Sequence, residues 1–244
     1  MRSTTTKIAG LTTRVVDNLP ENTKPSLSVV LCHGYGAPGD DLVAIGHEML
    51  TRSEKLSVST QFYFPQGPID LSSIGMFGCR AWWELDVEAI NLALQTGGFR
   101  ERARDDIPDG LIERRTQLTK FVDQIRMDHN LPADRVALGG FSQGCMLTTD
   151  VTFHLDSTPA ALIAWSGTLL NETNWRKQGQ KHKGLKVLQA HGVMDNMLPF
   201  EWAEYLRDVY ISAGMDVKFI KHNGTHTIPL EALAGGIDLL EGVM

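Results

Sequence analysis

At 244 residues the chain is long enough for one large α/β domain or two small ones, and its 42% hydrophobic and 21% charged residues are ordinary for a globular protein. The formal net charge of −6, with no block of Lys and Arg, argues against nucleic acid as a partner and against electrostatic docking on anionic membranes. Three cysteines without C-x-x-C spacing favour reduced thiols in the cytoplasm over a disulfide framework or a zinc site. The polar N-terminus lacks the apolar region of a signal peptide, and no apolar run approaches the length of a membrane span.

Beyond the first 25 residues, apolar runs typical of buried strands alternate with stretches of helical spacing. The expected strands cover residues 28–32, 61–65, 135–139, 160–165, 184–190 and 216–220. The expected helices cover residues 40–51, 111–129, 145–155, 200–213 and 229–240. Strands that alternate with helices throughout predict one doubly wound α/β domain over residues 1–244, with a mostly parallel sheet.

Two parts of the chain lack a regular pattern. Residues 1–25 mix Thr, Asn and Pro with one short apolar piece and indicate a leading arm or edge strand. Residues 69–108 are the least regular, and because a structureless loop of that length is uncommon in a compact domain, we expect a partial lid or pocket wall with a short helix near 87–94. Trp82 and Trp83 in this stretch fit either a substrate pocket or simple core filling, since large aromatic side chains bury well in both places.

Residues 140–144, Gly-Phe-Ser-Gln-Gly, have the G-x-S-x-G form of a nucleophile elbow. In that motif a serine occupies a strained turn between a strand and a helix, and the glycines avoid collisions that side chains would make there. The strand expected before Ser142 and the helix expected after it provide this context. The alternative is a glycine-rich turn with an idle serine. Cys145, just past the motif, indicates packing in the helix and not a nucleophile.

A serine hydroxyl is a weak nucleophile at neutral pH and needs a histidine base oriented by a carboxylate. In sheets that carry such an elbow, the chain order is Ser, then acid, then His. Among the acidic residues after Ser142, Asp195 alone follows directly on the carboxyl end of an expected strand, so we expect it to be the acid. Beyond the last strand, His226 lies in a loop just before a helix and is favoured as the base over His222, which stands at the strand's end.

The remaining groups near strand ends suggest supporting roles. The oxyanion that develops in acyl transfer needs two N–H donors, which we assign to the backbone of Gln143 and Tyr35. Since these are backbone groups, we expect the side chains at 35 and 143 to vary without loss. His33 and His191 precede glycines at strand ends and indicate loop bracing, whereas His182 lies in a Lys-rich stretch typical of the surface.

Four motifs, in order and at matching spacing from about residue 27 to the C-terminus, resemble the phospholipase/carboxylesterase family, which includes carboxylesterases, lysophospholipases and acyl-protein thioesterases. They are Leu31-Cys32-His33-Gly34-Tyr35-Gly36, Gly139-Gly140-Phe141-Ser142-Gln143-Gly144, His191-Gly192-x-x-Asp195 and Gly224-Thr225-His226. The resemblance implies an α/β-hydrolase fold without a large cap domain, and it carries the roles of nucleophile, acid and base onto Ser142, Asp195 and His226. Family members of this size often pair through surface helices, so a homodimer is among the expected assemblies.

The sequence departs from the family's pattern around the substrate. Val193 and Asn196 replace an Asp and a Pro that usually flank the acid, Cys145 replaces a small residue, and Tyr35 replaces a common Leu. No catalytic group is lost, but Tyr35 and Met197 are expected to reshape the pocket. We expect a cytoplasmic serine esterase that needs no metal or cofactor and cleaves small-molecule esters, thioesters or lysophospholipids. The alternatives are hydrolysis of a lactone or peptide on the same triad, or a non-catalytic binding protein on a retained hydrolase fold.

Overall fold

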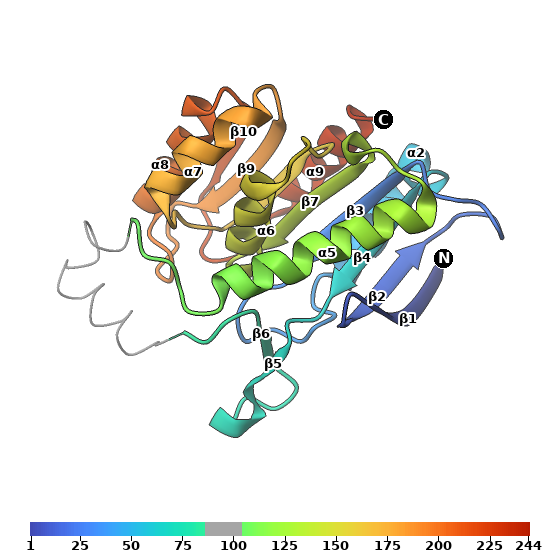
Figure 1. The fold of residues 1–244 in the computed structure, drawn as a ribbon, viewed down its shortest axis with the longest axis horizontal. Helices are drawn as coiled ribbons and strands as arrows, with labels where there is room; N and C mark the ends of the chain where they lie inside the picture. The colour runs from blue at the N-terminus through green and yellow to red at the C-terminus, as the bar shows by residue number, and fades with distance from the viewer. Residues whose placement is uncertain (86–103) are drawn as a thin grey trace.

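One eight-stranded sheet passes through the molecule, in the order β1-β2-β4-β3-β7-β8-β9-β10 (Figure 1). The computed structural model describes residues 1–85 and 104–244. The strands are β1 Arg2–Ile8, β2 Leu11–Asp17, β3 Leu27–Cys32, β4 Thr60–Pro65, β7 Val136–Phe141, β8 Leu162–Trp165, β9 Lys186–Gly192 and β10 Asp216–His222. All neighbours from β4 to β10 pair in parallel, while β1 and β2 pair antiparallel at one edge.

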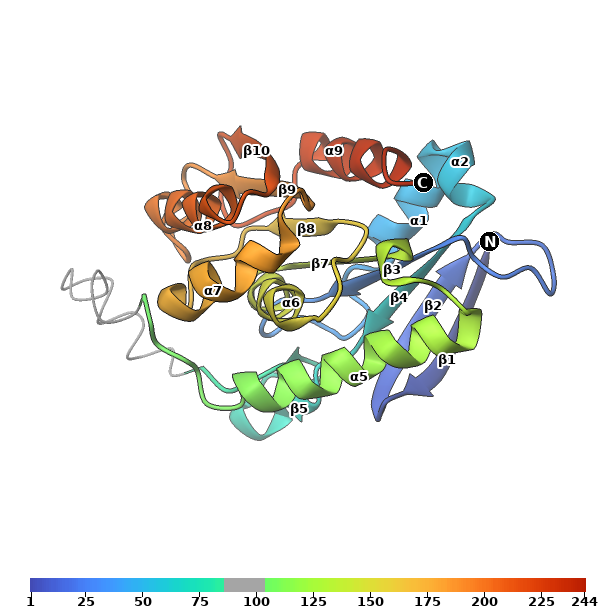
Figure 2. The ribbon, with the colours of Figure 1, turned by 45° about the horizontal axis from the view of Figure 1, so that its top comes forward.

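Helices cover both faces of this sheet (Figure 2). The helices of one face are α5 Leu111–His129, α6 Gln143–His154, α7 Glu172–Gly179 and α8 Phe200–Ser212, and those of the other are α1 Val43–Arg52, α2 Glu54–Ser57 and α9 Leu230–Glu241. Buried strand residues alternate between the two layers. Val30 and Leu138 pack with α5–α8, whereas their neighbours Val29 and Ala137 pack with α1, α2 and α9. This two-sided burial explains the unbroken apolar runs in the sequence.

The order of the strands changes direction beside β3. The chain leaves β3 for β4 on one side and later returns to pair β7 on the other side of β3, so the sheet order reverses between β3 and β7. Ligands of open α/β sheets bind outside the carboxyl ends of the strands at such a reversal. The register pairs Cys32 with Gly140, and therefore the loop after β3 and the elbow after β7 start at the same level.

The predicted α/β-hydrolase fold with a mostly parallel sheet is confirmed, and two segments differ from expectation. Residues 1–25, expected as an arm or a single edge strand, contain the hairpin β1–β2. Helix α7 was not predicted: it is only eight residues long and carries a single buried aromatic, Trp175, in an otherwise polar sequence. A periodic apolar pattern needs several buried positions, and α7 has too few.

The expected lid or pocket wall is described only in part. Its first third forms a small hairpin of β5 Ile69–Asp70 and β6 Arg80–Ala81, joined by the 3-10 helix η1 Leu71–Ile74. The short helix predicted near 87–94 lies outside the described residues. Among the helices of residues 1–85 and 104–244, none has the length and apolar character needed to cross a membrane.

Candidate active site

Ser142 stands on a sharp turn between β7 and α6, as a nucleophile elbow requires. Its backbone has φ 53° and ψ −119°, a positive-φ conformation that residues with a side chain rarely adopt. The turn is held because the Ser142 N–H donates to the carbonyl of Trp165 at the end of the neighbouring strand β8, at 3.0 Å. Strain of this kind survives only where the surrounding structure over-determines it and is common at functional sites.

The two glycines of the motif are required by close backbone contacts. A Cβ on Gly144 would lie 2.1 Å from the carbonyl oxygen of Cys32, and a Cβ on Gly140 would lie 2.5 Å from the carbonyl carbon of Gly144. Gly34 is similarly close, since a Cβ there would lie 3.2 Å from the Cβ of Ser142. The elbow is therefore pressed against the end of β3 and the loop that follows it.

The loops that carry the predicted acid and base are joined directly to each other. The N–H groups of Val193 and Met194 donate to the carbonyls of His222 and Gly224, at 2.8 and 3.1 Å. Between these loops, Nδ1 of His226 lies 2.6 Å from Oδ2 of Asp195. The structure thus brings together two residues that are 31 positions apart in the sequence.

The Asp195 carboxylate is fully buried and well supplied with donors. Its Oδ1 accepts the backbone N–H groups of Met197 and Leu198, each at 2.9 Å. Burial alone raises the pKa of Asp195, but the hydrogen bonds from His226 and from the Leu198 N–H outweigh it and hold the pKa below its usual value. The group is therefore an anion at neutral pH, able to accept a proton-bearing Nδ1 and to stabilise an imidazolium.

The base loop also lies on the elbow. The ring of His226 packs against that of Phe141, the residue before Ser142, with 4.7 Å between centroids. The hydroxyl of Ser166, one residue past β8, donates to the carbonyl of Thr227 at 3.4 Å. The side chain of His226 is mostly buried, with 10% of its surface exposed. The competing histidine, His222, is the last residue of β10, and its Nδ1 accepts the Gly224 N–H.

His33 and His191 brace loops, as expected from the sequence. Nε2 of His33 accepts the N–H of Gly67 at 2.9 Å, so its proton is on Nδ1, which donates to the Gly34 carbonyl at 2.8 Å. Burial lowers the pKa of His33 and keeps it neutral. Nε2 of His191 lies 2.8 Å from the Leu198 carbonyl and 3.3 Å from the Asp195 carboxylate, which fixes the acid loop.

The side chain of Gln143 does more than the sequence indicated. It is buried, its Oε1 accepts the N–H of Trp82 at 2.8 Å, and its Nε2 donates to the carbonyl of Trp83 at 2.9 Å. The expectation that this side chain may vary without loss did not foresee these two hydrogen bonds. Sequence alone offered no signal, because the partners are backbone groups some 60 residues away. Tyr35 lies half-buried in the loop after β3.

The three side chains predicted to line the substrate pocket fall into two groups. Trp82 and Trp83 are each 1% exposed and belong to the core beside α5 and α6, which is the packing role that the sequence left open. Trp82 also touches the loop after β3, because its Nε1 donates to the His33 carbonyl at 2.9 Å. Met197 is 59% exposed on the acid loop.

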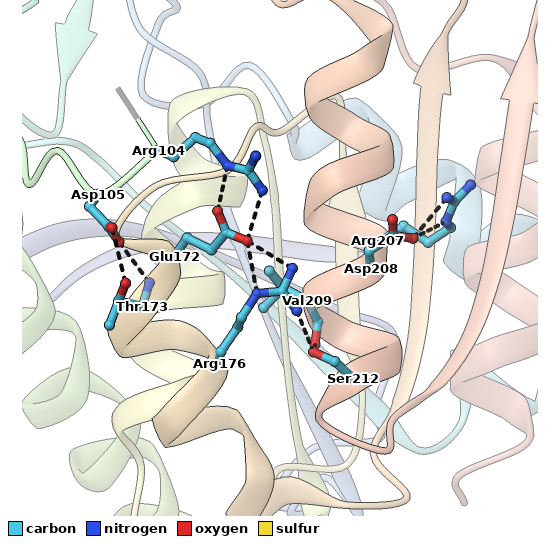
Figure 3. A network of polar contacts seen from close by, with 9 residues as sticks. All are labelled: Arg104, Asp105, Glu172, Thr173, Arg176, Arg207, Asp208, Val209 and Ser212. Carbon is cyan, nitrogen blue, oxygen red and sulfur yellow. Dashed lines mark hydrogen bonds and ion pairs between the residues drawn. The ribbon is translucent and has the colours of Figure 1, made fainter. Parts of the chain in front are cut away.

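Arg104 and Asp105, where the described chain resumes, form polar contacts with helix α7 (Figure 3). Arg104 donates to both carboxylate oxygens of Glu172, at 2.5 and 2.9 Å, and its guanidinium lies 4.5 Å from the ring centre of Tyr205. Asp105 accepts the backbone N–H of Thr173 at 2.7 Å, which satisfies a free donor in the first turn of α7. Helix α7, which these two residues contact, is the helix that the sequence did not predict.

Two of the cysteines are excluded as nucleophiles by their surroundings. Cys32 and Cys145 are fully buried free thiols. Burial raises the pKa of Cys145 to about 12 and that of Cys32 further still, so neither forms a thiolate at neutral pH. The packing role expected for Cys145 agrees with its position against Gly167.

Comparison with known proteins gives a consistent assignment. Residues 19–238 match the model of the phospholipase/carboxylesterase family. The chain is 26% identical over 215 residues to acyl-protein thioesterase 1 homolog 1 of Dictyostelium discoideum, covering 86% of this chain and 88% of that protein, and 22% identical over 224 residues to acyl-protein thioesterase 1 of Candida albicans, covering 89% and 92%. The crystal structure of esterase PE8 has the same fold, with a TM-score of 0.75, 23% identity and coverage of 94% and 97%. The chain therefore belongs to the phospholipase/carboxylesterase family and is a carboxylic ester hydrolase with the α/β-hydrolase fold.

Proposed function

We propose that the protein hydrolyses carboxylic esters through an acyl-enzyme, with Ser142 as nucleophile, His226 as base and Asp195 as acid. The observation that carries this proposal is the 2.6 Å contact between His226 Nδ1 and the buried Asp195 carboxylate, on loops that pack against the strained elbow of Ser142. A base with its outer nitrogen free and its inner nitrogen held by a carboxylate is what an activated serine requires.

In the first half of the reaction, Nε2 of His226 takes the proton of Ser142 Oγ as the oxygen attacks the acyl carbonyl carbon. The carbonyl π electrons move to oxygen, and the backbone N–H groups of Tyr35 and Gln143 stabilise the resulting oxyanion. Collapse of this intermediate breaks the bond to the leaving group, which departs with the proton from His226. In the second half, His226 takes a proton from water as the water oxygen attacks the acyl-serine carbonyl, and the second tetrahedral intermediate collapses. The bond to Ser142 Oγ breaks, His226 returns the proton to that oxygen, and the acid product leaves.

The leaving group is the open part of this proposal. Several relatives are named acyl-protein thioesterase, which favours thioesters as a second substrate class beside oxygen esters. Met197, which is exposed on the acid loop, remains the proposed contact to the acyl chain, with Tyr35 shaping the entrance, whereas the buried Trp82 and Trp83 are proposed to support the site from behind. The free, unbridged cysteines support the proposal of a reducing compartment such as the cytoplasm, and a homodimer remains the proposed assembly.

The test is Ser142→Ala compared with Ser157→Ala, an exposed serine just beyond the far end of α6. We expect Ser142→Ala to lose at least about 10⁴-fold in kcat on p-nitrophenyl esters with an unchanged melting temperature, and Ser157→Ala to keep full activity. A fluorophosphonate probe should label the wild type at Ser142 only. Turnover retained in Ser142→Ala, or labelling of a different residue, would overturn the assignment.

A further inference from the structure

We propose that residues 80–83 form a brace that sets the distance between the two proposed oxyanion donors, the backbone N–H groups of Tyr35 and Gln143. The Gln143 side chain attaches this brace to the elbow. In this view Gln143 contributes twice, with its backbone N–H to the oxyanion and with its side chain as a positioning group. The inference rests on the proposed function, because it concerns the geometry of the same acyl-transfer site.

On one side, the brace is attached to the elbow. The side-chain amide of Gln143 accepts a hydrogen bond from the Trp82 N–H and donates one to the Trp83 carbonyl. It therefore pairs with one backbone donor and one backbone acceptor on consecutive residues. A side-chain amide carries a donor and an acceptor side by side, as in Gln and Asn, and Asn is one methylene shorter. Gln143 is 1% exposed, and removal of its amide would leave two buried backbone groups without these partners.

On the other side, the brace is attached to the loop that carries Tyr35. The N–H of Arg80 donates to the Ala37 carbonyl and the N–H of Gly36 donates to the Arg80 carbonyl, both at 2.9 Å. The indole of Trp82 adds a third bond, to the His33 carbonyl at 2.9 Å. Bonds to Gly36 and His33 thus flank Tyr35, the residue whose N–H is the proposed second donor.

The consequence for catalysis follows from where the two donors lie. The N–H groups of residues 35 and 143 belong to different segments, one after β3 and one at the start of α6, yet both must point at one oxygen atom. Residues 80–83 bond to both segments and so set the distance between them. Since the oxyanion exists only in the tetrahedral intermediate and its transition states, a loosened brace should lower kcat and leave KM nearly unchanged.

The primary variant is Gln143→Met, which keeps the side-chain length and the backbone N–H but removes both side-chain bonds. Its matched control is Gln189→Met: Gln189 is also 1% exposed and donates to a backbone carbonyl, that of Ala203, at 2.7 Å, but it lies within β9. We expect Gln143→Met to lower kcat roughly 10- to 100-fold with KM within about twofold, less than complete loss of one oxyanion donor. Both variants lose buried hydrogen bonds, so we expect both to lower the melting temperature to a similar degree, but Gln189→Met should keep the wild-type kcat.

A second readout isolates the oxyanion. An aryl trifluoromethyl ketone forms a hemiketal whose oxyanion occupies the same donors, so its inhibition constant should rise in proportion to the fall in kcat/KM for Gln143→Met and stay unchanged for Gln189→Met. Trp82→Phe, which removes the bond to His33, should give a smaller kcat loss. The double variant should lose less than the product of the two single losses, since both changes loosen one brace.

The outcomes separate the two proposals. If the wild type shows no Ser142-dependent turnover, the proposed function fails. If that turnover is present but Gln143→Met keeps wild-type kcat and inhibitor affinity, or the effects of Trp82→Phe and Gln143→Met simply multiply, the brace is refuted alone. If Gln143→Met does not fold, Gln143→Asn and Trp82→Phe take its place with the same criteria.

Discussion

Gly144→Ala offers the sharpest test of how the elbow is built. The new Cβ would stand 2.1 Å from the carbonyl oxygen of Cys32, 2.4 Å from its carbonyl carbon and 2.5 Å from the His33 carbonyl oxygen. All three atoms are backbone, so no rotation of a side chain can make room. Ordinary contacts of this kind lie near 3.5 Å, and therefore β3 and the start of α6 must separate by roughly 1 Å.

The expected effect has a stability part and a catalytic part. Overpacking against rigid backbone destabilises by about 1–3 kcal/mol, which a helical Gly→Ala change offsets by up to about 1 kcal/mol. The same separation moves Ser142 and the Gln143 N–H away from the loop after β3. A displacement of about 1 Å lowers turnover on the order of 10²-fold.

The assay measures kcat/KM on p-nitrophenyl butyrate together with urea unfolding, and Gly235→Ala in α9 is the control. A Cβ at Gly235 would lie 3.0–3.1 Å from the methyl ends of Ile220 and Leu188, side chains that can shift. We expect the control to keep full activity and wild-type stability within about 1 kcal/mol. Gly144→Ala with wild-type kcat/KM would refute the reasoning, since it would mean that the contact between strand and elbow does not position the nucleophile.

Two further predictions follow from buried titratable groups. Asp195→Asn keeps an oxygen for the Met197 and Leu198 N–H groups but favours the wrong His226 tautomer, so kcat should fall about 10³–10⁴-fold with a preserved fold, and a loss below tenfold would contradict the acid's role. Burial lowers the pKa of His182 from 6.5 to about 4, so between these values the unfolded chain binds the proton more readily, and the unfolding free energy should fall as pH drops through that window, by up to about 3 kcal/mol. Urea unfolding at pH 7, 6 and 5 should show a shallower dependence in His182→Gln, and an unchanged slope would assign the effect to other groups.

His182 also shows where local composition misleads. It lies between Lys181 and Lys183, which predicts a surface position, yet it is fully buried and its Nδ1 lies 3.1 Å from the Thr158 hydroxyl. Its two lysine neighbours point to solvent while the histidine packs inward. In a single 3-10 turn, adjacent side chains face different directions, so neighbours in sequence say little about burial.

The alternation of strands and helices, the parallel sheet, the position of Ser142 on a strand-to-helix turn and the choice of Asp195 as the acid were all available from the sequence. Each depends on period, on local sterics or on which end of a strand a residue follows, and these properties are written in short stretches of chain. The contact of His226 with Asp195 agrees with that choice.

Only the tertiary structure decided what lies around this centre. The Gln143 side chain bonds to backbone groups of Trp82 and Trp83, and α7 receives Arg104 and Asp105 from a distant segment. Almost every residue type has the same backbone donor and acceptor, so the sequence does not indicate which side chain will bond to a given backbone group. The motifs of this sequence therefore predict its chemistry, whereas the contacts around the proposed oxyanion donors are created only by folding.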